Sequence, residues 1–194
     1  MEQKYPCIYP VFTKIPTPLH FATAYTVSHR PHINGVEVIL PGDTMIPDNK
    51  DMQLFYMYGK NYPTTDVSVR KSDSHNILED LQENLKKHKR SPFYLAVDET
   101  TARSKKFNRF LDEYPGVMIE LVPSTYHKLG AKMLKAIAES DSKGFKAFLP
   151  EELTEEDKQM CWELVKKQDP EIGNISERLS NMGYWRYVAS QIIN

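Results

Sequence analysis

Cysteine is scarce in this sequence, and its scarcity excludes two classes of protein. Cys7 and Cys161 are the only cysteines, they lie far apart in the chain, and no CxxC spacing is present. A disulfide framework and a four-cysteine zinc module are therefore both excluded. No apolar run is long enough for a membrane span or a signal peptide. These absences predict a cytoplasmic protein that does not insert into a membrane.

Glycine is also infrequent, with eight residues among 194. The spacings GxxxxGK[ST], GxGxxG and GxSxG are all absent, which excludes a standard nucleotide-binding loop and a nucleophile elbow. What the sequence does contain is an ordinary globular composition, with 40% hydrophobic and 26% charged residues. This balance favours a folded chain with one sizeable core over a disordered one.

The positive and negative charges of the chain nearly cancel, but they are concentrated in different segments. The net charge of −1 favours neither a nucleic-acid coat nor an acidic tail. Residues 84–109 nevertheless carry eight cations and two acids, whereas residues 151–177 carry nine acids and three cations. The cations of the first window are Lys86, Lys87, Lys89, Arg90, Arg103, Lys105, Lys106 and Arg109. They form either one positive patch for phosphate backbones or two solvated helix faces.

The first third of the chain has the pattern of strands separated by turns. Residues 21–29 (FATAYTVSH) and 36–42 (VEVILPG) are rich in β-branched and aromatic residues, and Asn34 and Gly35 lie between them. Asn-Gly favours the tight turn of a β-hairpin, so an antiparallel pair is predicted here. Residues 52–59 (MQLFYMYG) are predicted to form a third strand, because prolines flank them.

The middle of the chain changes to a helical period. Residues 72–90 place Ile77, Leu78, Leu81 and Leu85 on one face of a predicted helix. A strand at 92–99, a helix at 102–114 and a strand at 117–123 follow. This order predicts a βαβ unit with two parallel strands. Further helices are predicted at 126–140, 153–168 and 174–194.

The predicted fold class is α/β of the mixed α+β kind. N-terminal antiparallel strands join a βαβ unit, and a helical C-terminal part closes the structure. The expected organisation is a core domain over residues 1–149 and a helical segment over residues 150–194 that packs on the core.

The stretch FYLAVDETTARSKK, residues 93–106, holds the first candidate site. Asp98 and Glu99 follow one strand of the βαβ unit, and the second strand delivers His127 to the same edge, where parallel sheets bind ligands. The hypothesis makes Asp98 and Glu99 an acid/base or divalent-metal pair, with His127 as the proton carrier. Hydroxyls at a helix N-terminus and nearby cations favour phosphate. The phosphate-binding candidates are Arg103, Lys105, Lys106, Ser124, Thr125 and Lys128.

Helix capping accounts for the same residue types without any chemistry. A threonine of the TT pair after Glu99 would cap one helix, and Asp98 and Glu99 would complement its positive end. Ser124 or Thr125 would cap the next helix. From the sequence alone, both interpretations stay open.

A second candidate site consists of histidines. His20, His29 and His32 lie close together in the sequence, and imidazole is a common ligand of zinc and other transition metals. The alternative is that these histidines are exposed on the predicted hairpin.

Two functions follow from these patterns. The first is a small soluble enzyme, with hydrolase as the expected class, that acts on a phosphate-bearing substrate such as a nucleotide or nucleic acid. Its cofactor is left open, with a divalent metal as the candidate. The second is a non-catalytic protein that binds nucleic acid or an acidic protein partner through the basic region at 86–109.

Overall fold

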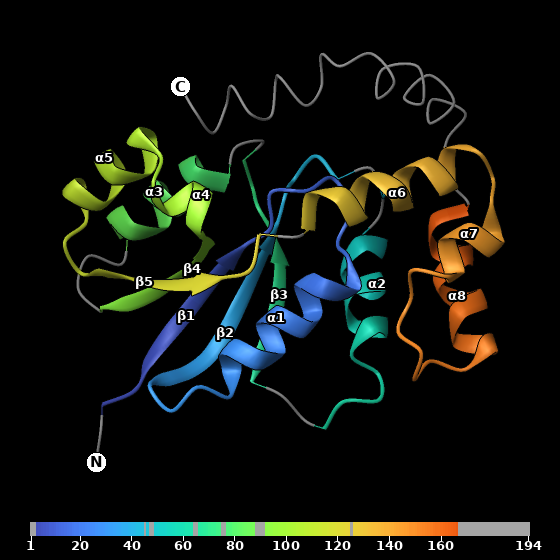
Figure 1. The fold of residues 1–194 in the computed structure, drawn as a ribbon. Coiled ribbons are helices and arrows are strands. Elements are labelled where there is room, and N and C mark those ends of the chain that lie inside the picture. Colours follow the sequence, from blue (N-terminus) through green and yellow to red (C-terminus); the bar gives the residue numbers. More distant parts are fainter. Residues whose placement is uncertain are drawn as a thin grey trace.

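The computed structural model of this chain describes residues 3–44, 46, 49–63, 66–74, 77–87, 92–124 and 126–166. Within these ranges helices and strands alternate along most of the chain (Figure 1). The elements are β1 Tyr5–Pro10, α1 Pro18–Ser28, β2 Ile33–Leu40, α2 Lys50–Tyr58, β3 Val67–Lys71, α3 Ile77–Lys87, β4 Phe93–Asp98, α4 Glu99–Ala102, α5 Lys105–Glu113, β5 Val117–Val122, α6 Tyr126–Ala138, α7 Ser142–Lys146 and α8 Glu155–Lys166.

The five strands form one all-parallel sheet in the order β3-β2-β1-β4-β5. Each connection between consecutive strands contains at least one helix, as parallel strands require. The prediction of N-terminal antiparallel strands is therefore wrong, and the fold is a Rossmann-like α/β fold. The parallel pairing of the strands at 93–98 and 117–122 was predicted correctly, with Asp98 opposite Val122.

The segment predicted as the first hairpin arm, residues 21–29, belongs mostly to helix α1. Thr17 is the N-cap residue, and Pro18 takes the first helical position, where its missing N–H is not needed. The buried side chains of α1 recur at helical spacing: His20, Phe21, Thr23, Ala24 and Val27. Packing of this face on the sheet outweighs the strand propensity of the individual residues.

The predicted Asn-Gly turn lies inside strand β2. Gly35 has φ 82°, and a Cβ built there would lie 3.3 Å from the Asp66 carbonyl oxygen. The backbone of β3 approaches closely at this point, since the Val36 N–H donates to that same oxygen at 2.7 Å. The absence of a side chain at Gly35 thus allows the backbones of two parallel strands to approach closely. The third predicted strand, residues 52–59, is also wrong, because it lies largely in helix α2.

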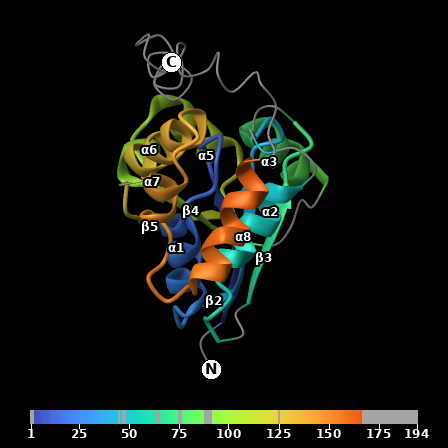
Figure 2. The same cartoon turned by 90° about the vertical axis from the view of Figure 1, so that its right-hand side faces the viewer.

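The sheet is covered by two unequal layers of helices (Figures 1 and 2). On one face α1, α2, α6, α7 and α8 enclose the larger core, whose sheet residues include Cys7, Tyr9, Val38 and Ala96. On the other face α3 and α5 enclose a smaller core around Leu95. The predicted helix at 174–194 lies outside the described residues, and no helix within the described ranges is long and apolar enough to span a membrane.

Both cysteine thiols are expected to be unreactive in the folded protein. Cys7 is 1% exposed and Cys161 is fully buried, and burial raises the pKa of each thiol to about 12. Since the thiolate is the reactive form, a disulfide reagent such as DTNB at pH 8 should label the folded chain far more slowly than the unfolded chain.

The same shifts set the direction of alkaline destabilisation. Unfolded thiols lose their protons near pH ~8.5, whereas the folded ones keep theirs up to about 12. The folded state therefore binds more protons than the unfolded state in this window, so the free energy of unfolding should fall as the pH rises above ~9. Urea titrations at pH 8 and pH 10 measure this. In the DTNB experiment, rapid labelling of both thiols in the folded protein at pH 8 would contradict their burial.

Candidate functional site

The sheet has one point at which the chain order reverses, between β1 and β4. The chain proceeds outward from β1 to β2 and β3, and then returns to place β4 on the other side of β1. The connections that leave β1 and β4 therefore diverge. Their carboxyl ends open a crevice of the kind in which open parallel sheets bind ligands.

His20 lies at this crevice, in the first turn of α1, and is only 2% exposed. The backbone N–H of Thr17 donates to its Nδ1 at 2.9 Å, and Thr17 Oγ1 lies 2.8 Å from the same nitrogen. A backbone N–H can only donate, so Nδ1 is the acceptor, and the proton of the neutral ring is on Nε2. The N-cap of α1 thus fixes both the orientation and the tautomer of His20.

The crevice is small and is formed by the ends of three strands. Its described lining residues are Tyr9, Pro10, Phe12, Thr13, His20, Ala96, Val97, Asp98 and Val122. Its volume is about 20 Å³, which suits one water molecule or one phosphate oxygen. Any larger ligand would place a single polar group in the crevice and extend outward over the loops at the carboxyl edge.

Lys14 supplies a cation in the loop between β1 and α1. Its ammonium group pairs with the Asp43 side chain, which follows β2, and lies 3.5 Å from the Asp43 carbonyl oxygen. Burial lowers the pKa of Lys14. The pair joins the loops that follow two neighbouring strands, so a positive charge is held at the same edge as His20. Sequence reasoning did not single out Lys14 at all.

Asp98 lies at the end of β4, where it was predicted, and its side chain caps a helix. Oδ1 of Asp98 accepts a hydrogen bond from the Thr101 N–H at 2.8 Å, which begins α4. Glu99 and Arg103 pair with each other one turn apart, and both are largely exposed. The acid that caps α4 is therefore Asp98, whereas the sequence pattern had suggested a threonine.

The phosphate-binding candidates after β5 are only partly described. Ser124 and Lys128 are exposed on the segment that leads from β5 into α6. Thr125 lies outside the described residues, and the side chain of His127 is not described. The structure thus places this segment at the predicted edge without showing what these side chains contact.

None of the described lining residues of the crevice belongs to α5, the helix that carries Lys105, Lys106 and Arg109. Lys105 is at the start of α5 and exposed, and the side chain of Lys106 is not described. Helix α5 shares its face of the sheet with α3, which carries Lys86 near its end (Figure 1). Lys89 and Arg90 lie outside the described residues, so the predicted basic patch is only partly described.

The three histidines predicted to bind a metal do not come together. His20 lies in the first turn of α1 and His29 follows the end of that helix, about 13.5 Å away at 1.5 Å per residue. His32 Nε2 lies 2.9 Å from Glu120 Oε2. No group of three or more histidine, cysteine or acidic side chains placed to hold a metal occurs in the described part of the chain. His20 and His29 thus lie at opposite ends of a helix and not around a hairpin turn, so the described residues do not support the predicted metal site.

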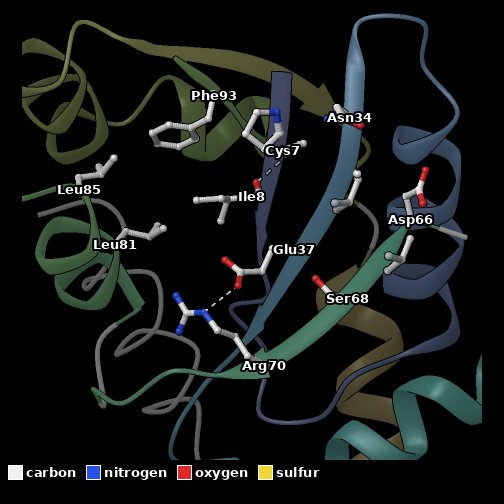
Figure 3. Close-up of a pocket in the computed structure, with 14 residues that line it drawn as sticks. Cys7, Ile8, Asn34, Glu37, Asp66, Ser68, Arg70, Leu81, Leu85 and Phe93 are labelled. Carbon is white, nitrogen blue, oxygen red and sulfur yellow. Dashed lines mark hydrogen bonds and ion pairs between the residues drawn. The ribbon is translucent and has the colours of Figure 1, made fainter. Parts of the chain in front are cut away.

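A larger cavity of about 690 Å³ lies elsewhere, on the α3 side of the sheet (Figure 3). Its described lining residues come from β1, β2 and β3, from Phe93 of β4, and from Leu81 and Leu85 of α3. Arg70 is its cation among the described lining residues, and it is already held by Asp80 at 2.8 Å and Glu37 at 3.3 Å. With no histidine and no helix N-terminus among those lining residues, this cavity is a weaker candidate for catalysis than the small crevice.

Comparison of the sequence with models of protein families and with curated proteins gives no match. Comparison of the structure with solved structures finds two complexes of Plasmodium falciparum nicotinic acid mononucleotide adenylyltransferase, one with NaAD and one with APC. Both have a TM-score of 0.54, at 13% and 14% identity, and the match covers 85% of this chain and 96% of the other. At this identity the likeness establishes a shared fold over nearly the whole length of that enzyme.

Proposed function

We propose that this chain is an enzyme that acts on nucleotides, and more narrowly a nucleotidyltransferase whose site is the crevice between β1 and β4. The observation that carries the proposal is the buried His20, held in one tautomer at the N-terminus of α1. The fold is shared with an enzyme whose name and bound NaAD denote adenylyl transfer to a mononucleotide. Both lines support a phosphate-bearing small molecule as the substrate.

Nucleotidyl transfer makes limited demands on the protein. A phosphate oxygen of the acceptor attacks the α-phosphorus of a nucleoside triphosphate, the bond to the β-phosphate breaks, and pyrophosphate leaves with the electron pair. Negative charge builds up on the phosphate oxygens, so catalysis comes from positioned N–H donors and cations and needs no covalent nucleophile. The described lining residues of the crevice include no cysteine or serine, which is consistent with this reaction class.

The described residues can supply these donors and cations. The Nε2–H of His20 would donate to a phosphate oxygen in the crevice, and the positive end of α1 would add to the same field. Lys14 would exchange part of its pairing with Asp43 for a second phosphate. In the proposed arrangement the nucleotide spans the carboxyl edge, with His20 near the reacting phosphorus and Lys14 beside the phosphates.

The residues first predicted from the βαβ unit take supporting roles in the proposal. Asp98 forms part of the crevice wall and keeps α4 in place. Ser124, Thr125 and Lys128 would meet phosphates that extend toward β5, and His127 would lie beside them. We propose transfer and not hydrolysis as the reaction class because both solved structures that share this fold are complexes of an adenylyltransferase.

Asp98→Asn separates capping from a need for negative charge. Asparagine caps helices about as well as aspartate, so the free energy of unfolding should change by less than ~0.5 kcal/mol. If Asp98 acts only as a cap, turnover should also stay within about twofold of the wild type. Asp98→Ala should cost about 1 kcal/mol. Urea denaturation and steady-state kinetics on the two variants measure this, and a large loss of turnover in the stable Asn variant would show that the carboxylate charge is required.

The test of the function is a direct assay for transfer. The purified chain is incubated with ATP and Mg²⁺, with and without nicotinic acid mononucleotide and other phosphate-bearing acceptors. The proposal predicts pyrophosphate release that depends on an acceptor, with a dinucleotide-type product found by mass spectrometry. Release of inorganic phosphate and ADP without an acceptor would instead show a hydrolase. An absence of nucleotide binding would contradict the proposal as a whole.

A further inference from the structure

Helices α2 and α8 form an exposed apolar groove that the proposed function does not use. The groove has a volume of about 830 Å³. Tyr56 and Met160 are 51% and 50% exposed, and both lie in this groove with Met57 and Leu164. Large exposed apolar side chains that gather in one place mark interaction surfaces. Figure 2 shows the two helices side by side on the surface that faces the viewer.

The two helices of the groove run in opposite directions. Lys60, just after α2, pairs with Asp157 near the start of α8 at 2.5 Å, and the Asn61 side chain donates to the Glu152 carbonyl at 2.6 Å. The end of α2 therefore lies beside the start of α8. The start of α2, at Lys50, lies beside the end of α8, where Glu163 and Leu164 complete the groove.

Charge is arranged in a regular way around the apolar centre. The α2 side of the groove carries Lys50 at one end and Lys60 at the other. The α8 side carries Glu163 opposite Lys50 and Glu156 opposite Lys60. Glu163 pairs with Lys166 of its own helix at 3.4 Å and accepts a hydrogen bond from Gln159, and no ion pair joins it to Lys50 within the subunit. One side of the groove is thus basic, the other is acidic, and the centre is apolar.

This pattern is complementary to itself under one orientation of a two-fold axis. An axis along the groove places α2 of one subunit on α8 of the other, so that Lys50 faces Glu163 of the partner subunit and Tyr56 faces Met160 of the partner subunit. An axis across the groove places Lys50 against Lys60 of the partner subunit, which is repulsive. Isologous contacts require such self-complementarity, and the charges select a single arrangement.

We propose that the α2–α8 groove is a homodimer interface, in which a second copy of this chain packs with α2 against the partner's α8. The twelve residues of α8 span about 18 Å, so each subunit contributes less than the ~800 Å² of a standard interface. The dimer is therefore weak, with a dissociation constant in the micromolar range. Tyr56 and Met160 form its centre.

Sedimentation equilibrium of the full chain from about 5 to 500 μM tests the dimer. The wild type should shift from monomer to dimer across this range. Met160→Glu should raise the dissociation constant at least tenfold, because it places a charge at the apolar centre. Glu155→Lys is the matched control, since Glu155 lies on the same helix but not in the groove, and it should change nothing.

Charge reversal distinguishes this arrangement from any other use of the groove. Lys50→Glu and Glu163→Lys should each weaken the dimer several-fold, because each places like charges opposite one another. The double variant should restore association to within about twofold of the wild type, since every pair is complementary again. Thermal unfolding confirms that the variants remain folded. A double variant weaker than either single variant would overturn the proposal.

A wild-type chain that stays monomeric at 500 μM would also overturn it. Hydroxyl-radical labelling of Met160 in that monomer would then show whether another part of the same chain covers the groove. Dimerisation that is unaffected by Met160→Glu would place the interface elsewhere. None of these outcomes depends on nucleotide transfer.

Discussion

His20→Asn is expected to reduce nucleotidyl transfer by about 10²–10³-fold while the protein stays folded. Asparagine can still accept the hydrogen bond from the Thr17 N–H, because its side-chain oxygen takes the position near Nδ1. It is too short to replace the Nε2–H that points from the far side of the ring. The variant therefore removes the proposed donor and keeps the helix cap. Steady-state kinetics together with urea denaturation separate the two effects.

Two further variants make this experiment specific. His20→Gln keeps a donor at about the reach of Nε2 but loses the cap acceptor, so it should retain more activity and less stability than His20→Asn. His29→Asn is the matched control, because His29 lies exposed at the opposite end of α1 and should leave activity unchanged. Full activity in His20→Asn would remove histidine from the mechanism.

Asp51→Ala is expected to lower the free energy of unfolding by about 3 kcal/mol. The Asp51 side chain is fully buried, with Oδ2 lying 3.2 Å from Lys71 Nζ and 2.7 Å from Thr44 Oγ1. Oδ1 accepts from the Met52 N–H at 2.9 Å. Alanine would leave the partly buried Lys71 without its counter-charge and would remove an acid from the first turn of α2. For a chain of this size the melting temperature should fall by roughly 6–12 °C.

Asp51 lies at the carboxyl edge of the sheet, yet it is expected to act on stability and not on chemistry, because its oxygens face the protein interior. The activity per folded molecule of Asp51→Ala should match that of the wild type when measured well below its melting temperature. Asp73→Ala, at an exposed acid beyond β3, is the control and should be nearly neutral. If Asp51→Ala were stable but inactive, Asp51 would have to be assigned a role in the proposed site.

The parts of the fold that were predicted correctly are those with a local signal. Helix α3 shows its apolar spacing and its basic end within one stretch, and β4 and β5 are short apolar runs on either side of a helix. The strands predicted at 21–29 and 52–59 were wrong because helices α1 and α2 are rich in residues that favour strands. Phe21 and Val27 pack on a helical face, which becomes clear only once the sheet beneath them is known. The Thr17-Pro18 pair was a usable start signal for α1 that the strand interpretation overlooked.

The residues of the candidate site also differ in whether a local sequence signal could place them. Asp98 could be placed at the carboxyl edge because it directly follows a strand with a clear apolar pattern. His20 could not, because its place in the crevice depends on β1 lying next to β4, a contact between residues almost ninety positions apart. Lys14 could not either, because its pairing with Asp43 depends on β1 and β2 being neighbouring parallel strands. Once α1 is assigned as a helix, His20 falls in its first turn and His29 at its end. The assignment of α1 as a helix therefore separates His20 from His29 and places His20 at the crevice.

The most direct test of the central claim is a titration of ¹⁵N-labelled full-length protein with ATP and Mg²⁺, followed by amide chemical shifts. The account predicts saturable shifts in the loop from Phe12 to His20 and around Asp98, with at least tenfold weaker binding in Lys14→Ala. Saturable shifts confined to the cavity around Arg70 and Leu81, or no shifts at all, would contradict a nucleotide site between β1 and β4.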